Sequence, residues 1–202
     1  MPIKLILIRH GETPWNNERR IQGGSSDTAM SHVGIKQAES LALALKEEKL
    51  SAIYSSPLQR ALETARAIAQ SHNLEVQVEP ALRELEVGEL EGVLAGTLGS
   101  DFSQFLIHWN NSNGHAKTPG GESLADLQQR AWTAVQRIAA RHEGTVVMVS
   151  HYFTILTIFC AVLGLPPGGI RRFRVNVGSM STLDFRDGRA CLTSLGDTCH
   201  LG

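Results

Sequence analysis

The sequence predicts an α/β fold, a three-layer sandwich in which helices cover both faces of a mainly parallel central sheet. Short apolar runs alternate along the chain with longer segments of helical period. The runs at residues 5–8 and 146–149 are apolar at every position, as expected for strands buried on both faces of a parallel sheet. Residues 180–185 and 190–195 alternate apolar and polar side chains, which predicts an antiparallel edge.

Length and composition predict one domain over residues 1–202. The chain is 42% hydrophobic and 19% charged, with a formal net charge of -1, so no basic field recruits nucleic acid or an anionic membrane. The most apolar stretch, residues 153–165, is too short to span a bilayer and predicts a core helix. The three cysteines form no C-x-x-C pair, which predicts reduced thiols and a cytoplasmic location.

The first half of the chain carries a long loop and two helix signals. Residues 11–31 are polar and glycine-rich, too irregular for a helix, and loops this long in compact domains are usually functional. A helical pattern covers residues 31–49, and residues 51–54 predict a short strand. Ser55-Ser56-Pro57 then predicts a helix start, with a capping serine and proline at the first helical position. Arg60 falls in the first turn, where the helix dipole favours anions, so we expect it to help hold an anionic ligand.

The second half begins with a short strand at residues 76–78 and continues into an insertion. Residues of about 86–122 follow no clear period, contain a candidate helix at 102–109 and predict a lid. Ser123, with Asp126 three residues later, predicts a capped helix that ends near the next strand. That strand stops in His151, as the first strand stops in Arg9-His10-Gly11.

Four side chains are expected to meet at one edge of the sheet. Parallel strands of an α/β fold place their chemistry at their carboxyl ends, where the following loops open onto one crevice. This edge collects Arg9, His10, Arg60 and His151. Two guanidinium groups and two imidazoles in one crevice predict a phosphate site.

At this point the motifs resemble those of the histidine phosphatase superfamily, also called the phosphoglycerate mutase-like fold. The resemblance starts at Arg9-His10-Gly11-Glu12-Thr13 and covers nearly the whole chain. Its further motifs are Asn16, Gln22-Gly23, Ser55 to Ala61, the Glu84 region, Gly120-Gly121-Glu122-Ser123 and Val149-Ser150-His151. Several motifs in the family order are far more specific than Arg-His-Gly alone.

The resemblance implies a role for each site residue. His10 attacks the phosphoryl group and becomes a phosphohistidine, while Arg9, Arg60 and His151 stabilise the charge on the phosphoryl oxygens. Glu84 is the expected proton donor, with Glu86 and Glu89 as alternatives nearby. The implied phosphate contacts are Asn16, Gln22 and Gly23. Neither a metal ion nor a cofactor is expected, because the arginines neutralise the phosphate.

Two features resemble a narrower group, the metal-independent phosphoserine phosphatases of bacteria. These are the run Gly120-Gly121-Glu122-Ser123-Leu124 and the tail at residues 197–202. The resemblance implies a small phosphorylated metabolite such as L-phosphoserine as substrate, with His200 reaching its amino-acid end. A broad-specificity sugar phosphatase or an α-ribazole phosphatase stays open as an alternative. A phosphoglycerate mutase and a catalytically silent binding module are weaker ones. A homodimer is a family-level expectation.

Overall fold

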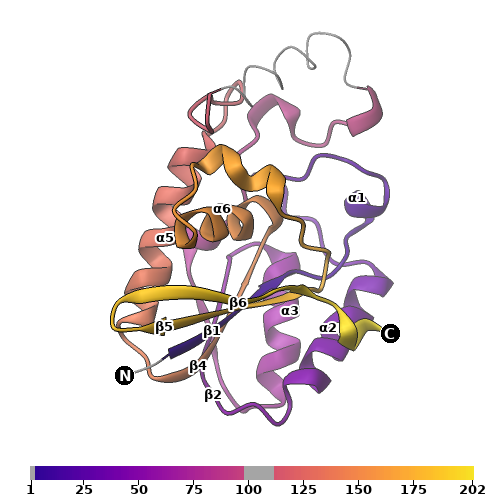
Figure 1. Cartoon of the computed structure of the whole chain (residues 1–202). Helices are drawn as coiled ribbons and strands as arrows, with labels where there is room; N and C mark the ends of the chain where they lie inside the picture. The colour runs from indigo at the N-terminus through magenta and orange to yellow at the C-terminus, as the bar shows by residue number, and fades with distance from the viewer. Residues whose placement is uncertain (1–2, 98–111) are drawn as a thin grey trace.

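The computed structural model describes residues 3–97 and 112–202, and in that part of the chain six strands form one sheet (Figure 1). Their order across the sheet is β3-β2-β4-β1-β5-β6. The strands are β1 (Ile3–Arg9), β2 (Leu50–Ser55), β3 (Val76–Val78), β4 (Gly144–Ser150), β5 (Met180–Arg186) and β6 (Arg189–Asp197). The first four strands pair in parallel, whereas β5 and β6 add an antiparallel hairpin at one edge. The predicted mainly parallel sheet with an antiparallel edge is confirmed.

Helices cover both faces of this sheet, which makes the three layers. Helices α2 (His32–Leu45) and α3 (Gln59–Gln70) pack on one face, and α5 (Leu124–Ala139) and α6 (Tyr152–Val162) pack on the other (Figure 1). The strands explain why both faces are apolar, since successive side chains point to opposite sides. In β1, Leu5 and Leu7 join the core under α5 and α6, while Ile6 and Ile8 join the core under α2 and α3.

Short helical turns complete the fold. One four-residue helix, α1 (Pro14–Asn17), lies inside the segment predicted to be a loop. Its signal is Thr13-Pro14, a capping threonine followed by proline at the first helical position, and it is too short to show a helical period. The five 3₁₀ turns among the described residues are η1 (Pro80–Leu82), η2 (Gly88–Leu90), η3 (Ala95–Thr97), η4 (Pro167–Arg172) and η5 (Cys199–Leu201).

Of the two predicted capping signals, one is confirmed and one is wrong. Ser123 with Asp126 forms the predicted capping box at α5, and Ser31, which was not predicted as a cap, caps α2. Helix α3, however, begins at Gln59 after Leu58, without a side-chain cap. The predicted cap at Ser55-Ser56-Pro57 is wrong because the Ser56 hydroxyl pairs with an imidazole of the site instead.

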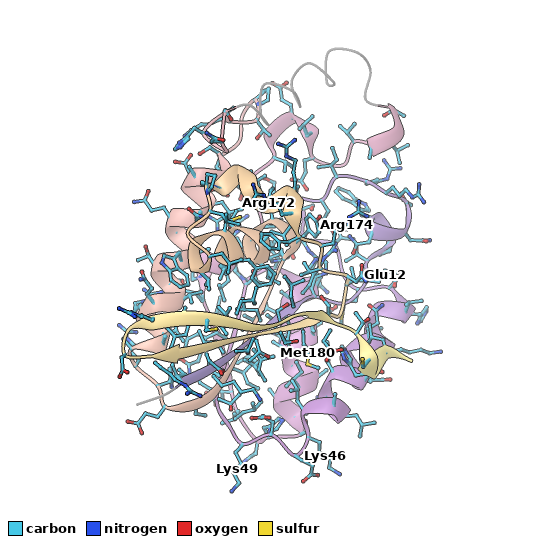
Figure 2. The ribbon with its side chains drawn as sticks, viewed as in Figure 1. Glu12, Lys46, Lys49, Arg172, Arg174 and Met180 are labelled. Carbon is cyan, nitrogen blue, oxygen red and sulfur yellow. The ribbon has the colours of Figure 1, made fainter. Side chains whose placement is uncertain are left out.

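Strand register brings the expected loops together. Arg9 pairs with Ser150 at the ends of β1 and β4, and Ser55 of β2 pairs with Val149 of β4. Figure 2 places Glu12, in the loop after β1, at the end of the sheet away from Lys46 and Lys49, which precede β2. The carboxyl ends of the parallel strands therefore meet at a single edge, as predicted.

The predicted lid at 86–122 is only partly described, and the candidate helix at 102–109 lies outside the described residues. Its first part is bonded to the loop after β1. The Ile21 N–H donates to the carbonyl of Val93 (2.9 Å), and the Gly92 N–H donates to the carbonyl of Ile21 (2.9 Å). In the residues that the structure covers, no helix is both long and apolar enough to cross a membrane.

Candidate active site

His10 lies directly after β1 and is almost fully buried. Its backbone N–H donates to the carbonyl of Ser150 (3.0 Å), and its ring Nδ1 lies 2.8 Å from the carbonyl oxygen of Gly11. Because a carbonyl oxygen only accepts, Nδ1 carries the proton and Nε2 keeps its lone pair. Burial, and then the charges of Arg60 and Arg9, hold the pKa of His10 well below its ordinary value. The ring is therefore neutral and able to act as a nucleophile near pH 7.

Arg9, which is half-buried, and Arg60, which is fully buried, bring two positive charges to His10. Arg60 is fully buried in the first turn of α3, where its guanidinium donates to the carbonyl oxygens of Ser26 (2.8 Å) and Gly23 (3.0 Å). Burial lowers the pKa of Arg60 to about 10, so it is still charged near neutral pH. Arg9 donates to the carbonyl of Val175 (2.9 Å), and burial lowers its pKa as well.

His151 follows β4, and its ring centroid lies 5.1 Å from that of His10. Its Nε2 is 2.7 Å from the Ser56 hydroxyl, which also accepts the N–H of Leu58 (3.3 Å). Its Nδ1 is buried without a partner among the described residues. Burial first, and then the charge of Arg60, hold the pKa of His151 well below its ordinary value, so this ring is neutral too.

The Glu84 carboxylate sits at the N-terminus of α6. One oxygen accepts the N–H of Phe153 (3.1 Å), and the other accepts the N–H of Leu85 (2.9 Å) and lies 3.2 Å from both the N–H and the hydroxyl of Thr154. Burial raises the pKa of Glu84 above its ordinary value, although these hydrogen bonds and the two arginines oppose the shift. A carboxyl group balanced in this way can serve as an acid in one step and a base in the next.

Asn16 and Gln22 form a polar group fixed by Thr13. The Thr13 hydroxyl lies 3.1 Å from Asn16 Oδ1 and 3.0 Å from Gln22 Oε1, and Asn16 Nδ2 donates to Gln22 Oε1 (3.5 Å). These bonds hold both amides beside the helical turn α1. Gln22 Nε2 is buried and has no partner in the described part of the chain.

A pocket of about 230 Å³ lies beside His10. Its lining includes five of the residues predicted from the sequence, namely Arg9, His10, Asn16, Gln22 and Glu84. Arg60 and His151 are fully buried next to His10 and do not themselves line the pocket. We call the five residues that the sequence predicts to be catalytic, Arg9, His10, Arg60, Glu84 and His151, the catalytic cluster.

Four buried nitrogen atoms of this region have no hydrogen-bond partner among the described residues. They are Nε of Arg9, Nε of Arg60, Nε2 of Gln22 and Nδ1 of His151. Buried donors without partners are costly, and two of these belong to guanidinium groups. A ligand with several anionic oxygens in the pocket would satisfy the two that belong to lining residues, Arg9 and Gln22, as a phosphoryl group does. Residues 3–97 and 112–202 hold no group of three or more His, Cys, Asp or Glu side chains placed to bind a metal ion.

Comparison with known proteins decides the family. Residues 5–198 match the model of the histidine phosphatase superfamily (branch 1). The chain belongs to the histidine phosphatase superfamily. It is a phosphatase, as the resemblance of its motifs predicted.

Relatives of this phosphatase share most of its length. It is 36% identical to phosphoserine phosphatase 1 of Hydrogenobacter thermophilus over 201 residues, which cover 99% of this chain and 95% of that protein. A phosphoserine phosphatase of Entamoeba histolytica, solved with 3-phosphoglyceric acid, is 33% identical with a TM-score of 0.85 and covers 98% of this chain and 99% of its own. The α-ribazole phosphatase of Shigella flexneri is 29% identical with a TM-score of 0.85 and covers 96% of each chain.

Gly23, predicted to contact phosphate, does not line the pocket of the phosphatase. Its N–H donates to a carboxylate oxygen of Glu91 (2.8 Å), and its carbonyl accepts from Arg60. A Cβ at this position would lie 2.5 Å from a methyl group of Val87 and 2.7 Å from the carbonyl of Leu85. Glycine is needed for this close packing, which places its carbonyl against the arginine.

His200, predicted to reach the substrate, is also absent from the pocket lining. It lies in η5, where its Nε2 is 2.9 Å from the carbonyl oxygen of Gly178. The N–H of Gly178 in turn lies 3.1 Å from the carbonyl of Arg9 and 3.0 Å from that of His10. The structure therefore places His200 behind the backbone that carries His10, with one ring nitrogen occupied.

Sequence reasoning missed the residues that hold Glu84 in place. Arg130 of α5 donates to the carbonyl oxygens of Ala81 (2.7 Å), Arg83 (2.9 Å) and Glu84 (3.0 Å), and it pairs with the carboxylate of Glu122 (2.5 Å). The motif Gly120-Gly121-Glu122-Ser123 is visible in the sequence, but nothing in its pattern indicates that the glutamate binds an arginine of the next helix. Ser56 is visible in the sequence only as a cap.

Proposed function

We propose that the protein hydrolyses phosphomonoesters of small metabolites through a phosphohistidine formed at His10. One observation carries the proposal. A buried, neutral imidazole with a free Nε2 lies beside Arg9 and Arg60 and shares a pocket with a buried carboxyl group, that of Glu84. This combination supplies a nucleophile, charge stabilisation and a proton donor for phosphoryl transfer.

The first step forms a nitrogen–phosphorus bond. His10 Nε2 attacks the phosphorus, the bond between phosphorus and the ester oxygen breaks, and Glu84 gives its proton to the departing alcohol. In the second step a water molecule attacks the phosphohistidine while the Glu84 carboxylate takes its proton. The nitrogen–phosphorus bond breaks, inorganic phosphate leaves, and both residues return to their starting states.

The remaining residues act on the phosphoryl oxygens. The guanidinium groups of Arg9 and Arg60 stabilise their charge, and the Gln22 amide adds a donor beside Asn16. In our proposal the Ser56 hydroxyl, which accepts the N–H of Leu58, donates its own proton to Nε2 of His151. The proton of His151 then resides on Nδ1, from which it is donated to the phosphoryl group.

The substrate predicted from the sequence is L-phosphoserine. Its support is similarity, since the relatives from Hydrogenobacter thermophilus and Entamoeba histolytica are phosphoserine phosphatases. The α-ribazole phosphatase of Shigella flexneri has the same fold at lower identity and supports the alternative of a larger ester. The reaction chemistry proposed for the catalytic cluster is the same for all of these substrates.

Phosphate release by the purified, EDTA-treated protein tests the proposal. The panel is L-phosphoserine, 3-phosphoglycerate, sugar phosphates, α-ribazole phosphate and 4-nitrophenyl phosphate, with His10→Ala as the control. Release that the His10→Ala variant lacks supports the proposal. Release that survives in His10→Ala, or no release from any ester, contradicts it.

A further inference from the structure

Outside the residues proposed to act in catalysis or phosphate binding, the described pocket lining is mostly apolar, with Arg20 and Thr118 as its polar members. Ile21 comes from the loop after β1, Leu85, Val87 and Leu90 come from the segment after Glu84, and Phe153 comes from the first turn of α6. We call these five side chains the apolar wall. The Tyr152 ring extends the wall, with the guanidinium carbon of Arg9 5.0 Å from its centroid.

The wall is rigidly attached to the core. Leu85 and Val87 are buried members of the core under α5 and α6, and Ile21, Leu90 and Phe153 pack against it. The backbones of Ile21 and the segment ending at Val93 hold each other through two hydrogen bonds, those between Ile21 and Val93 and between Gly92 and Ile21. The apolar character of the pocket therefore comes from a built surface, because its side chains belong to the core of the protein.

The described lining carries few charged groups outside the catalytic cluster. Glu84 is the single acid among them, and its carboxylate is held by backbone N–H groups at the start of α6. The other cation besides Arg9 is Arg20, whose guanidinium pairs with Glu18 (2.5 Å) and donates to the carbonyl of Gly92 (3.0 Å). Among the described lining residues, Glu84 is therefore the one acid that could face an ammonium group, and it lies in the catalytic cluster and not in the apolar wall.

We propose that the preferred substrates carry an apolar leaving group, a branched aliphatic or aromatic alcohol that packs against the apolar wall. This inference rests on the proposed function and narrows it. Apolar atoms gain free energy when the wall removes them from water. Against the apolar wall, the ammonium group of L-phosphoserine loses hydration without gaining an anionic partner from these five side chains, which disfavours binding. The pocket has a volume of about 230 Å³, so small leaving groups are used to test the proposal.

Three alkyl esters that differ in polarity test the proposal on the wild-type protein. These are 3-methylbutyl phosphate, glycerol 3-phosphate and L-phosphoserine, whose leaving alcohols are similar in size and lack an activated aryl group. The expected kcat/KM for 3-methylbutyl phosphate exceeds that for L-phosphoserine about tenfold or more. A fourth ester, 4-nitrophenyl phosphate, reports whether the catalytic cluster functions, since its good leaving group needs little help from an acid.

The variant Leu90→Ala tests whether the apolar wall causes the preference for an apolar leaving group. Leu90 is half-buried, and its truncation removes apolar contact without touching the catalytic cluster. The ratio of kcat/KM for 3-methylbutyl phosphate to that for glycerol 3-phosphate is expected to fall about tenfold. The matched control is Leu43→Ala, at a leucine that is 74% exposed on α2, and it leaves this ratio unchanged.

Failure of this inference and failure of the proposed function give different results. If L-phosphoserine is hydrolysed as well as or better than 3-methylbutyl phosphate, or if Leu90→Ala leaves the ratio unchanged, the inference about the leaving group is overturned while the proposed function stands. If none of the four esters is hydrolysed, the proposed function fails and the inference fails with it.

Discussion

The catalytic cluster and the apolar wall border the same pocket but are built in different ways. The cluster comes from the ends of β1 and β4 and the first turn of α3, together with Glu84 at the start of α6, so strand pairing and helix packing fix its members. The wall comes mainly from the loop after β1 and the segment after Glu84. The difference teaches that the proposed chemistry rests on residues fixed by the sheet and its helices, whereas the proposed leaving-group preference rests mainly on loops.

Removing the nucleophile from the cluster should have the largest effect. His10→Ala is expected to lower kcat/KM about a thousandfold or more for every ester, because no other described side chain offers a free imidazole nitrogen at the attacking position. Steady-state phosphate release measures this loss. His32→Ala, at an exposed histidine at the start of α2, is the matched control and should retain full activity. Comparable losses in both variants would contradict the assignment.

Removing the proton donor should have a large effect that depends on the ester. Glu84→Gln is expected to lower kcat/KM about a hundredfold or more for alkyl esters, and much less for 4-nitrophenyl phosphate, whose leaving group needs no proton. Glu89→Gln, at an exposed neighbour that was an alternative donor in the sequence, should be unaffected. An equal loss on both kinds of ester would assign Glu84 a structural role.

The pH dependence sharpens the same assignment. Glu84 must be protonated to act as an acid, and burial raises its pKa, so activity on alkyl esters should persist at a higher pH than an ordinary carboxyl would allow and fall as pH rises through the raised pKa. The lowered pKa of His10 keeps the nucleophile unprotonated on the acid side. The pH–rate profiles of the wild type and of Glu84→Gln are measured on the same ester. The substrate's own titration affects both profiles equally, so the difference between them reports the protein. If the activity of Glu84→Gln falls at high pH as the wild-type activity does, the decrease does not come from deprotonation of Glu84.

Removing the support of His151 should have a moderate effect. Ser56→Ala deletes the hydroxyl 2.7 Å from Nε2 of His151 and is expected to lower kcat/KM about tenfold, with weaker inhibition by inorganic phosphate. The inhibition constant is measured in competition with 4-nitrophenyl phosphate. Ser194→Ala on the exposed edge strand β6 is the control. An unchanged inhibition constant would show that the Ser56–His151 contact does not act on the phosphoryl group.

The smallest effect is expected at Arg20, the charged residue of the described lining that lies outside the catalytic cluster. Arg20→Gln should change kcat/KM for 3-phosphoglycerate less than about threefold, because the charge of Arg20 is already paired with Glu18 and a half-exposed pair is weak. A large, selective loss on 3-phosphoglycerate would mean that Arg20 binds the substrate carboxylate. The part of the pocket next to the apolar wall would then also bind a charged group of the substrate.

The cluster was predictable from the sequence, and the wall was not. Buried strands that end in His10 and His151, and an arginine at an unfavourable place in a helix, indicate an anion site through the residue pattern alone. Ile21, Val87 and Leu90 carry no such signal, because apolar residues in irregular segments have no period that assigns them a side. The positions of Gly23 and His200 could not be predicted either, since their hydrogen bonds depend on how loops meet.

Trapping the phosphorylated protein tests the central claim most directly. Wild-type protein and Glu84→Gln are mixed with 4-nitrophenyl phosphate, quenched within milliseconds to seconds, and the modified residue is located by mass spectrometry under alkaline conditions that preserve phosphohistidine. We expect the phosphoryl group on His10, at a higher level in Glu84→Gln, because the base that activates water is missing. Turnover without any phosphorylated histidine, or with the phosphoryl group on another residue, would contradict the account.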